Sequence, residues 1–462
     1  MTTATRRTVL YVFTAAICVL AIGFIGSLSG FLSTDMPREW IPTNWAIQDG
    51  AKFLRANSLS YDHALPEARG SGSMDMDMDV SIQRESGVII CLHDAIVSMG
   101  ASLIRELRCL GNQEVIQVYH CLNELSDESK ALLTRNDAKV EIIDACSELL
   151  PDPNVFNNDE ELANSFQNYW IKPLAMYHTR LTDVILLDAD VVLLQDPAEM
   201  RALSGYNRTG TTFFHDRIRF MRKFFNKQSK EGKQMLREIL ETFNYQLFGL
   251  EGPQNSEYLN QSFAYREETG HEMDSSMVFM DKLRAGKAVQ VLKHLILNTR
   301  FRYNFSWGDK EAFWLAYELA HQDYFFSPWG LSLVDSVPNA DMHEHPESLC
   351  GSMAHFIPTE NEQDPPELLY VNGKALLEPY PGGVDKALES GRSRMFNVFP
   401  THVTPRYRHS SFDLSTRKTF ECLDDLGSTP IDPSFHQHLL QRRRHYFALE
   451  THVYQALDRC GV

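Results

Sequence analysis

The segment "TDVILLDADVVLLQDP", residues 182–197, carries a pair of carboxylates between two apolar runs. The first run begins at Val184 and predicts a buried strand, and Asp188 and Asp190 follow at its end. A third carboxylate, Asp196, follows the second run. A carboxylate beside a hydrophobic strand is costly unless a cation or a hydrogen-bond donor partners it. The pattern therefore indicates that the aspartate pair holds something at the end of this strand.

Strands and helices alternate around this segment. Short apolar runs predict four strands, at residues 87–94, 114–120, 140–144 and 183–188. Helical spacing predicts helices at residues 95–111, 126–136 and 164–181. Ser126 is the expected N-cap of the second helix, and the third starts or breaks near Pro173. Such alternation is typical of parallel βαβ units, so the pair lies at the carboxyl end of a strand in an open α/β sheet, where ligands bind.

Three interpretations of the aspartate pair compete. The first is a loop whose carboxylates face solvent or cap a helix. The second is a phosphatase of the haloacid dehalogenase type, because "DADVV" fits its nucleophile motif. The third is a sugar-nucleotide-dependent glycosyltransferase, in which the pair clamps a divalent cation on the donor's pyrophosphate. The phosphatase motif belongs on the first strand, whereas about a hundred residues of βα units come first here, and Phe313 stands where a second downstream acid is wanted.

The geometry of the pair suits one cation. Because only Ala189 separates the two aspartates, an extended backbone points both side chains the same way. Carboxylate oxygens are suited to Mn²⁺ or Mg²⁺, and such a dication neutralises charge on a departing diphosphate.

Composition excludes one class of partner. The chain has 462 residues and a formal net charge of −17, from 44 Lys+Arg against 61 Asp+Glu. No broad basic footprint is available to neutralise phosphates, so we expect no nucleic-acid partner. The length allows one large domain with additions or two modest ones, and 43% hydrophobic residues suffice for a packed core.

The N-terminus predicts membrane attachment. Two arginines precede residues 8–32, which contain no charged residue. At about 1.5 Å per residue this run exceeds the roughly 30 Å hydrocarbon core of a bilayer. We expect a cytosolic tail at 1–7, a transmembrane signal-anchor at 8–32 and a lumenal remainder that begins with a stem at 33–85. A cleaved signal peptide is the alternative, since small residues near the end of the run offer a cleavage site.

Two further features of the sequence agree with lumenal exposure. Three N-glycosylation sequons begin at Asn207, Asn260 and Asn304. Seven of the eight cysteines lie outside the predicted anchor without metal-ligand spacing, and one or two disulfides could form among them in pairings that the sequence leaves open. Near the C-terminus, residues 434–461 predict an amphipathic helix, on which the run Arg442–Arg444 is expected to be a solvated face.

Six segments, in order, carry a family resemblance: "IKPLAMYHTRLTDVILLDADVVLLQDP", "YNRTGTTFFHDR", "MDSSMVFMDK", "WGDKEAFWLAYEL", "CGSMAH" and "LLYVNG". From about Gly87 to Pro379 the chain resembles the fungal-type Golgi α-mannosyltransferase family that extends N- and O-linked mannans. The resemblance implies a Rossmann-like nucleotide-diphospho-sugar transferase domain of the GT-A type. We assign residues 86–400 to it and residues 401–462 to a C-terminal helical extension.

The resemblance also implies the reaction. It implies that a mannosyl residue moves from GDP-mannose to a mannoside or glycoprotein glycan with retention of the α configuration, aided by Mn²⁺ or Mg²⁺. It also implies a single-pass type II protein of the Golgi membrane. No carboxylate is assigned as a nucleophile. One alternative is the same fold with another hexose donor, UDP-glucose or UDP-galactose. Another is a catalytically silent sugar-binding Golgi protein.

The resemblance implies the ligands of the metal. It makes Asp190 a metal ligand and shares Asp188 between the metal and the nucleotide. His355 is the candidate third ligand, because related enzymes place a histidine after the last sheet element. His343 and His345 are rival candidates.

Other residues are expected around the two substrates. The resemblance implies that Lys172 approaches the donor's phosphates or sugar hydroxyls. Asp274 and Ser275 open "DSSM" where the family has Glu-Ser-Gly-Gln, so they could bind donor hydroxyls, but the lost Gly and Gln put the sugar in doubt. Asp309 and Glu311 are expected to open a helix beside the acceptor, where a carboxylate could orient its hydroxyl or stabilise an oxocarbenium-like sugar. Helix capping is their alternative role.

Overall fold

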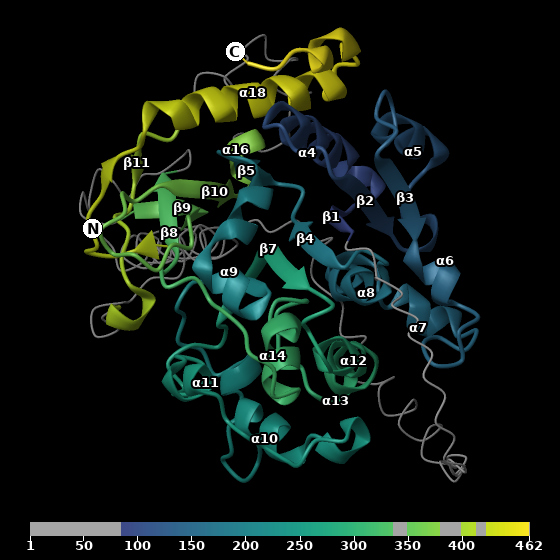
Figure 1. Ribbon diagram of the computed structural model, residues 1–462, viewed down its shortest axis with the longest axis vertical. Helices are drawn as coiled ribbons and strands as arrows, with labels where there is room; N and C mark the ends of the chain where they lie inside the picture. Colours follow the sequence, from purple (N-terminus) through teal and green to yellow (C-terminus); the bar gives the residue numbers. More distant parts are fainter. Residues whose placement is uncertain (1–84, 336–348, 379–398, 413–421, 462) are drawn as a thin grey trace, which may run out of the picture. The chain divides into compact units, whose positions relative to one another are not determined.

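The computed structural model describes residues 85–335, 349–378, 399–412 and 422–461 (Figure 1). The predicted cytosolic tail, the anchor at 8–32 and nearly all of the stem lie outside these residues, as do His343 and His345. Among the helices that the structure does describe, none combines the length and the hydropathy of a membrane span.

The first sheet has six strands in the order β3-β2-β1-β4-β7-β6. Their bounds are Ser86–Cys91 (β1), Val115–His120 (β2), Val140–Asp144 (β3), Asp183–Leu187 (β4), Thr211–His215 (β6) and Met273–Asp281 (β7). Strands β1 to β4 pair in parallel, whereas β7 is antiparallel to both β4 and β6. The predicted α/β class and its parallel βαβ units are therefore confirmed.

The connecting helices follow the predicted pattern. Ser126 caps α5 by accepting a hydrogen bond from the amide of Ser129, as predicted. The helix α8 begins at Ile171, so Pro173 lies in its first turn, where a missing amide hydrogen costs no helical hydrogen bond. The helices are α4 (Val97–Cys109), α5 (Asp127–Leu133), α6 (Ala145–Leu149), α7 (Glu160–Asn164), α8 (Ile171–His178), α9 (Ser204–Thr209), α10 (Met235–Thr242), α11 (Glu257–Gln261), α12 (Ala288–His294), α13 (Arg300–Arg302), α14 (Ala312–Leu319), α16 (Lys374–Leu377) and α18 (Pro433–Glu450).

A second, antiparallel sheet has the order β13-β11-β8-β9-β10-β5, with β12 paired to β9. Its strands are β5 (Val191–Leu193), β8 (Ser332–Asp335), β9 (Leu349–Phe356), β10 (Leu368–Asn372), β11 (His402–Val403), β12 (Cys422–Leu423) and β13 (Thr429–Pro430). Strand β5 follows the aspartate pair, so residues 188–190 join the two sheets. Strands β11, β12 and β13 come from the predicted C-terminal extension, which is therefore not purely helical.

Strand β4 separates two hydrophobic cores. All five of its residues are buried. Val184 and Leu186 contact the core that includes residues of α8, α12 and α14, whereas Ile185 and Leu187 contact the core that includes α4 and α18. Because both faces of this strand are covered, residues 184–187 are all apolar, which explains the unbroken run in the sequence.

The arginine run of α18 is not the solvated face that the sequence predicts. Helix α18 packs along α4 (Figure 1), and Arg442 and Arg443 are 0% and 1% exposed. Their guanidinium groups have hydrogen-bond acceptors in the interior: Arg442 donates to the carbonyl oxygen of Ala189 at 2.6 Å, and Arg443 to that of Leu376 at 2.6 Å. The prediction considered charge alone and was wrong, because backbone carbonyl oxygens can accept hydrogen bonds from a buried guanidinium group.

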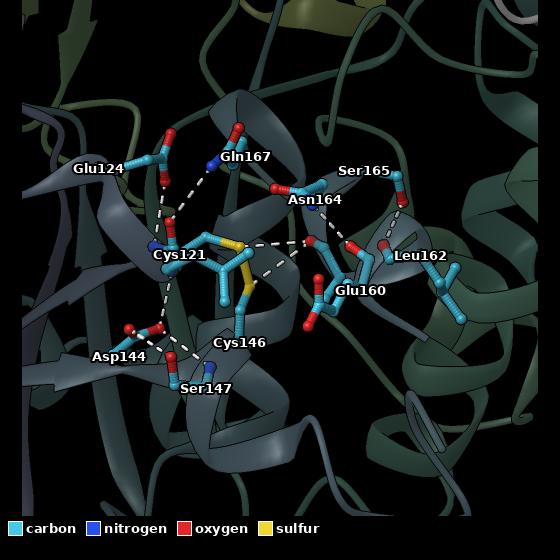
Figure 2. Close-up of a disulfide and its surroundings, with 12 residues drawn as sticks. Cys121, Glu124, Asp144, Cys146, Ser147, Glu160, Leu162, Asn164, Ser165 and Gln167 are labelled. Atoms are coloured by element: carbon cyan, nitrogen blue, oxygen red, sulfur yellow. Dashed lines mark hydrogen bonds between the residues drawn. A yellow bond between two sulfur atoms is a disulfide. The ribbon is translucent and has the colours of Figure 1, made fainter. Parts of the chain in front are cut away.

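Three disulfides are present among the described cysteines: Cys109–Cys460, Cys121–Cys146 and Cys350–Cys422. Figure 2 shows the second of them, which links the end of β2 to α6. Beside it, the carboxylate of Asp144 accepts from the amides of Leu122 and Ser147 (Figure 2). The disulfide and these hydrogen bonds fix the carboxyl ends of β2 and β3.

Peptide mapping without reduction is expected to recover these three pairs and to find Cys91, the free thiol of the described residues, unpaired. The pairing joins segments as far as 351 residues apart in the chain, so only the folded protein brings them together. Protein refolded in a reducing buffer and then alkylated serves as the control. Recovery of Cys121 in a pair other than with Cys146 would contradict the fold at this edge of the sheet.

Candidate active site

The aspartate pair lies in a turn between the two sheets. The amide of Val191 donates to the carbonyl oxygen of Asp188 at 3.3 Å, and the amide of Asp188 donates to the carbonyl oxygen of Ser276 at 2.8 Å. The extended backbone expected across Ala189 is therefore wrong at this point. The two carboxylates still act on each other, because the charge of Asp188 contributes to raising the pKa of Asp190.

Lys172 connects three of the other predicted site residues. It lies in the first turn of α8 and is 6% exposed. Its Nζ lies 2.8 Å from Oδ1 of Asp188 and 3.2 Å from Oδ2 of Asp309. It also donates to Oγ of Ser275, on β7, at 3.1 Å. Helix α8, the turn after β4, strand β7 and the segment before α14 thus meet at one ammonium group.

Electrostatics at this meeting point favour the charged lysine. Burial lowers the pKa of Lys172, but the carboxylates of Asp188 and Asp309 outweigh it and hold that pKa above its usual value. Burial also raises the pKa of Asp309, and Lys172 opposes that effect. Burial and then the charge of Asp188 raise the pKa of Asp190 to about 6. The aspartate pair is therefore richer in negative charge than one lysine balances.

Asp274 lies in a second polar cluster, on the neighbouring part of β7. Its Oδ2 lies 3.0 Å from Nε2 of His355, on β9, and accepts from Oγ of Ser276 at 2.5 Å. The Ser276 hydroxyl is also 3.2 Å from the hydroxyl of Tyr370, on β10. Burial raises the pKa of Asp274, but the hydrogen bond and charge of His355, with Lys310, lower it below its usual range. This cluster joins β7 to the second sheet.

The predicted metal ligands are not all brought together. Among the described residues, Asp188, Asp190 and His355 do not form a group whose ligand atoms all lie within 4.8 Å of one another. The Nε2 of His355 is instead bonded with Asp274. The structure leaves the aspartate pair as the core of a candidate metal site, and His355 as a ligand stays a prediction that this geometry does not support.

Glu311 occupies a position unlike that of Asp309. It is fully buried, and its Oε1 accepts from the amides of Glu272 and Met273 at 3.0 and 3.3 Å. Its Oε2 accepts from Nε1 of Trp314 at 2.5 Å. Both oxygens thus hold the start of β7 against the start of α14. Of the two acids predicted near the acceptor, Asp309 has the contacts with the candidate site.

One ion pair of this region was missed from the sequence. Lys310 Nζ lies 2.6 Å from Oδ2 of Asp216, just after β6, and its charge also acts on Asp274. Both residues stand inside segments that carry the family resemblance, "FFHDR" and "WGDKEAF". That location was the available signal, but a lysine and an aspartate 94 residues apart gave no reason to pair them.

The chain matches a protein-family model described as "Mannosyltransferase putative" over residues 85–356. The matched region is more than half of the 462 residues. It contains Lys172, the aspartate pair, Asp274 and Asp309, so all residues of the two polar clusters except Tyr370 lie within the matched part of the chain.

Two curated yeast proteins are similar to part of this chain. "Probable alpha-1,3-mannosyltransferase MNT4" of Saccharomyces cerevisiae is 28% identical over 305 residues, covering 63% of this chain and 50% of that protein. "Alpha-1,3-mannosyltransferase MNT3" of the same organism is 26% identical over 309 residues, covering 63% and 47%. The chain thus spans about half the length of these relatives.

Among solved structures, that of the mannosyltransferase Ktr4p from S. cerevisiae is similar over 61% of this chain and 76% of that chain, with 12% identity and a TM-score of 0.32. A score of this size is too low for a conclusion about fold or ligand.

Proposed function

The chain belongs to this mannosyltransferase family, and on that premise we propose that it transfers a mannosyl residue from GDP-mannose to a mannoside of a glycoprotein glycan, with retention of the α configuration. The observation that carries the proposal is the cluster at Lys172, where Asp188, Ser275 and Asp309 from three separate segments meet the lysine of α8. The domain that holds this cluster is proposed to be of the GT-A type.

The aspartate pair fits a divalent cation. Among the described residues, the carboxylate of Asp190 forms no ion pair and accepts no side-chain hydrogen bond, although burial and Asp188 raise its pKa to about 6. Two carboxylates, of which only Asp188 has an ion-pair partner among the described residues, suit Mn²⁺ or Mg²⁺. When bound there, such an ion neutralises the negative charge that develops on the departing diphosphate.

The protein's own residues prepare this site. The 2.8 Å contact between Nζ of Lys172 and Oδ1 of Asp188 holds this carboxylate in place. The second oxygen of Asp188 is not part of this contact. We assign Lys172 to positioning the carboxylates rather than to the donor's phosphates, since its ammonium group already contacts Asp188, Asp309 and Ser275. A carboxylate held at a fixed place acts without the cost of reorganisation when charge develops.

Asp309 and Asp274 are proposed to act on the sugars. Asp309 is held by Lys172, so its charge is fixed beside the donor site, where it can stabilise an oxocarbenium-like sugar or orient the acceptor hydroxyl. Asp274 is kept ionised by His355 and Lys310 and can accept hydrogen bonds from donor hydroxyls. Ser275 belongs to the same strand segment and contacts Lys172.

Features outside the site support a lumenal location. Three disulfides are typical of proteins that fold in an oxidising compartment. The sequon residues Asn207, Asn260 and Asn304 are all exposed, as N-glycosylation requires. We propose a Golgi membrane protein whose catalytic domain is lumenal.

A transfer assay with a panel of nucleotide sugars tests the reaction. The purified protein is incubated with an α-mannoside acceptor and GDP-mannose, UDP-glucose or UDP-galactose, with Mn²⁺ or with a chelator. We expect a product with GDP-mannose and Mn²⁺ that disappears on chelation. Transfer from a UDP-hexose in preference to GDP-mannose would favour the other donors, and transfer from none of them would favour a silent sugar-binding protein.

Replacing Lys172 with methionine is expected to lower kcat by about 100-fold, the size typical of losing one preorganised charged contact. Methionine keeps much of the volume but removes the ammonium group between Asp188 and Asp309. Lys374→Met is the matched control, because that lysine pairs with Glu378 at the surface. Thermal melting of both variants shows whether the fold survives. Equal kcat in wild type and Lys172→Met protein would remove the lysine from the mechanism.

A further inference from the structure

A group of potential metal ligands lies apart from the aspartate pair. His215 ends β6, Glu272 directly precedes β7, and His409 begins a short 3-10 turn, His409–Ser411. Strands β6 and β7 pair at this point, where His215 lies opposite Met273. One ligand atom from each of the three residues lies within 4.8 Å of the others. Three distant segments thus bring two imidazoles and a carboxylate together.

Three of the four ring nitrogens of the two histidines lack a hydrogen-bond partner among the described atoms. His215 is 2% exposed, and its Nδ1 has no hydrogen-bond partner among the described atoms. Both ring nitrogens of His409 also lack one there. Oε1 of Glu272 lies 3.4 Å from Nε2 of His409 and 4.0 Å from Nδ1 of His215. Buried polar atoms are rarely left unpaired, so we expect these nitrogens to bind a ligand.

Hydrogen bonds from neighbouring residues orient His215 and Glu272, as such bonds commonly orient metal ligands. Nε2 of His215 lies 3.0 Å from the carbonyl oxygen of Ser327, which selects the tautomer that leaves a lone pair on Nδ1. Glu272 accepts from the amide of Ala264 at 2.8 Å through Oε2 and from the hydroxyl of Tyr258 at 3.0 Å through Oε1. Hydrogen bonds of this kind, from outside the ligand set, fix the direction of ligating groups.

Charge also favours a cation here. The ion-pair partners that Glu272 has among the described residues are His215 and His409 alone. Both are weak bases, and Glu272 is 2% exposed. A buried carboxylate needs a compensating positive charge, which two imidazoles supply poorly unless they are protonated. A dication bound by all three residues would balance the negative charge of the Glu272 carboxylate.

We propose that His215, Glu272 and His409 form a structural Zn²⁺ site that fastens the segment around residue 409 to β6 and β7. Two nitrogens and one oxygen, with a water molecule in the fourth position, suit Zn²⁺ in a tetrahedral arrangement, whereas Mn²⁺ and Mg²⁺ prefer the all-oxygen set of the aspartate pair. The two imidazole rings are stacked, with centroids 3.4 Å apart and planes 2° from parallel. One ring therefore tilts when both nitrogens turn toward one ion.

Metal analysis and titration test the site. The full chain, purified without chelator, is expected to retain about one zinc per chain, and cobalt substitution is expected to give the absorption of tetrahedral Co²⁺. His409→Gln and Glu272→Gln should each weaken zinc binding at least about tenfold. His438→Gln, a histidine of α18 outside the group, should leave it unchanged. The double variant Asp188→Ala/Asp190→Ala should also keep its zinc, which separates this site from the proposed catalytic metal.

Thermal melting gives a second readout that does not depend on activity. Added Zn²⁺ should raise the Tm of metal-stripped wild-type protein and of the His438→Gln variant, but not that of His409→Gln. If stripped wild-type protein binds no zinc, or if His409→Gln binds it as tightly as wild type, the site does not exist and water or direct contacts satisfy the three residues. Octahedral cobalt spectra would equally overturn the proposal.

Discussion

Replacing Asp190 with alanine is expected to lower the rate of mannosyl transfer by at least about 10³-fold, the upper range for removing one preorganised electrostatic group. Asp190 is the member of the pair that forms no ion pair and accepts no side-chain hydrogen bond in the described part of the chain, so we expect its carboxylate to be available to the cation. Asp188 shares its charge with Lys172, and Asp188→Ala should cost somewhat less. Rates are measured at saturating GDP-mannose over a range of Mn²⁺ concentrations.

The matched control is Asp196→Asn, in the same sequence segment. Asp196 caps the 3-10 helix Pro197–Ala202 by accepting from the amide of Ala198, and asparagine caps as well as aspartate. This variant should keep wild-type rates. An Asp190→Ala protein that melts like wild type and still transfers mannose at the wild-type rate would contradict the assigned role.

Replacing Arg442 with methionine is expected to lower the free energy of unfolding by about 3 kcal/mol, as breaking a buried charged network does. The guanidinium donates to the carbonyl oxygens of Met99 and Ala189 and to the Ser102 hydroxyl, and its Nε lies 3.5 Å from Oε2 of Glu106. Methionine fills the space but removes the donor to Ala189 and to the Ser102 hydroxyl and the positive charge beside Glu106, whereas the carbonyl oxygen of Met99 still accepts from Ser102. Denaturant unfolding of wild type and variant measures the change.

The same substitution should also affect the site, because Ala189 is the residue between the two aspartates. Without Arg442 the turn at 188–190 loses a 2.6 Å hydrogen bond to α18, so affinity for Mn²⁺ should fall along with stability. Arg444→Met is the control: Arg444 donates to the carbonyl oxygens of Arg459 and Gly461 near the surface, and its loss should cost about 1 kcal/mol or less. Equal stability of the two variants would contradict the importance of the buried guanidinium.

Local patterns predicted the first half of the sheet well. Each of the strands β1 to β4 is a short apolar run with a break on both sides, and the runs at residues 140–144 and 183–188 match β3 and β4 almost residue for residue. The second sheet could not be predicted in the same way. Strand β5 has three residues and pairs with β10, about 180 residues later, so nothing local marks it as the start of a new sheet.

The candidate site was predicted through the family resemblance more than through the residues themselves. Lys172, Ser275 and Asp309 were each expected near the donor or acceptor, and the structure brings Ser275, Asp309 and Asp188 to Lys172. Their mutual contacts were not predictable, because pairings between residues far apart in the chain depend on packing. Burial also reversed one expectation, since the charge of Arg442 suggested solvent while its partners lie in the interior. The chemical roles of these residues stay predictions.

The measurement that tests the central claim most directly is the binding of GDP with and without Mn²⁺. Isothermal titration of wild-type protein and of Asp188→Ala/Asp190→Ala protein compares the dissociation constants under both conditions. We expect Mn²⁺ to tighten GDP binding at least about tenfold in wild-type protein, since the ion neutralises the diphosphate, and to have no effect in the double variant. Tightening by Mn²⁺ that is the same in both proteins would contradict a cation held by the aspartate pair.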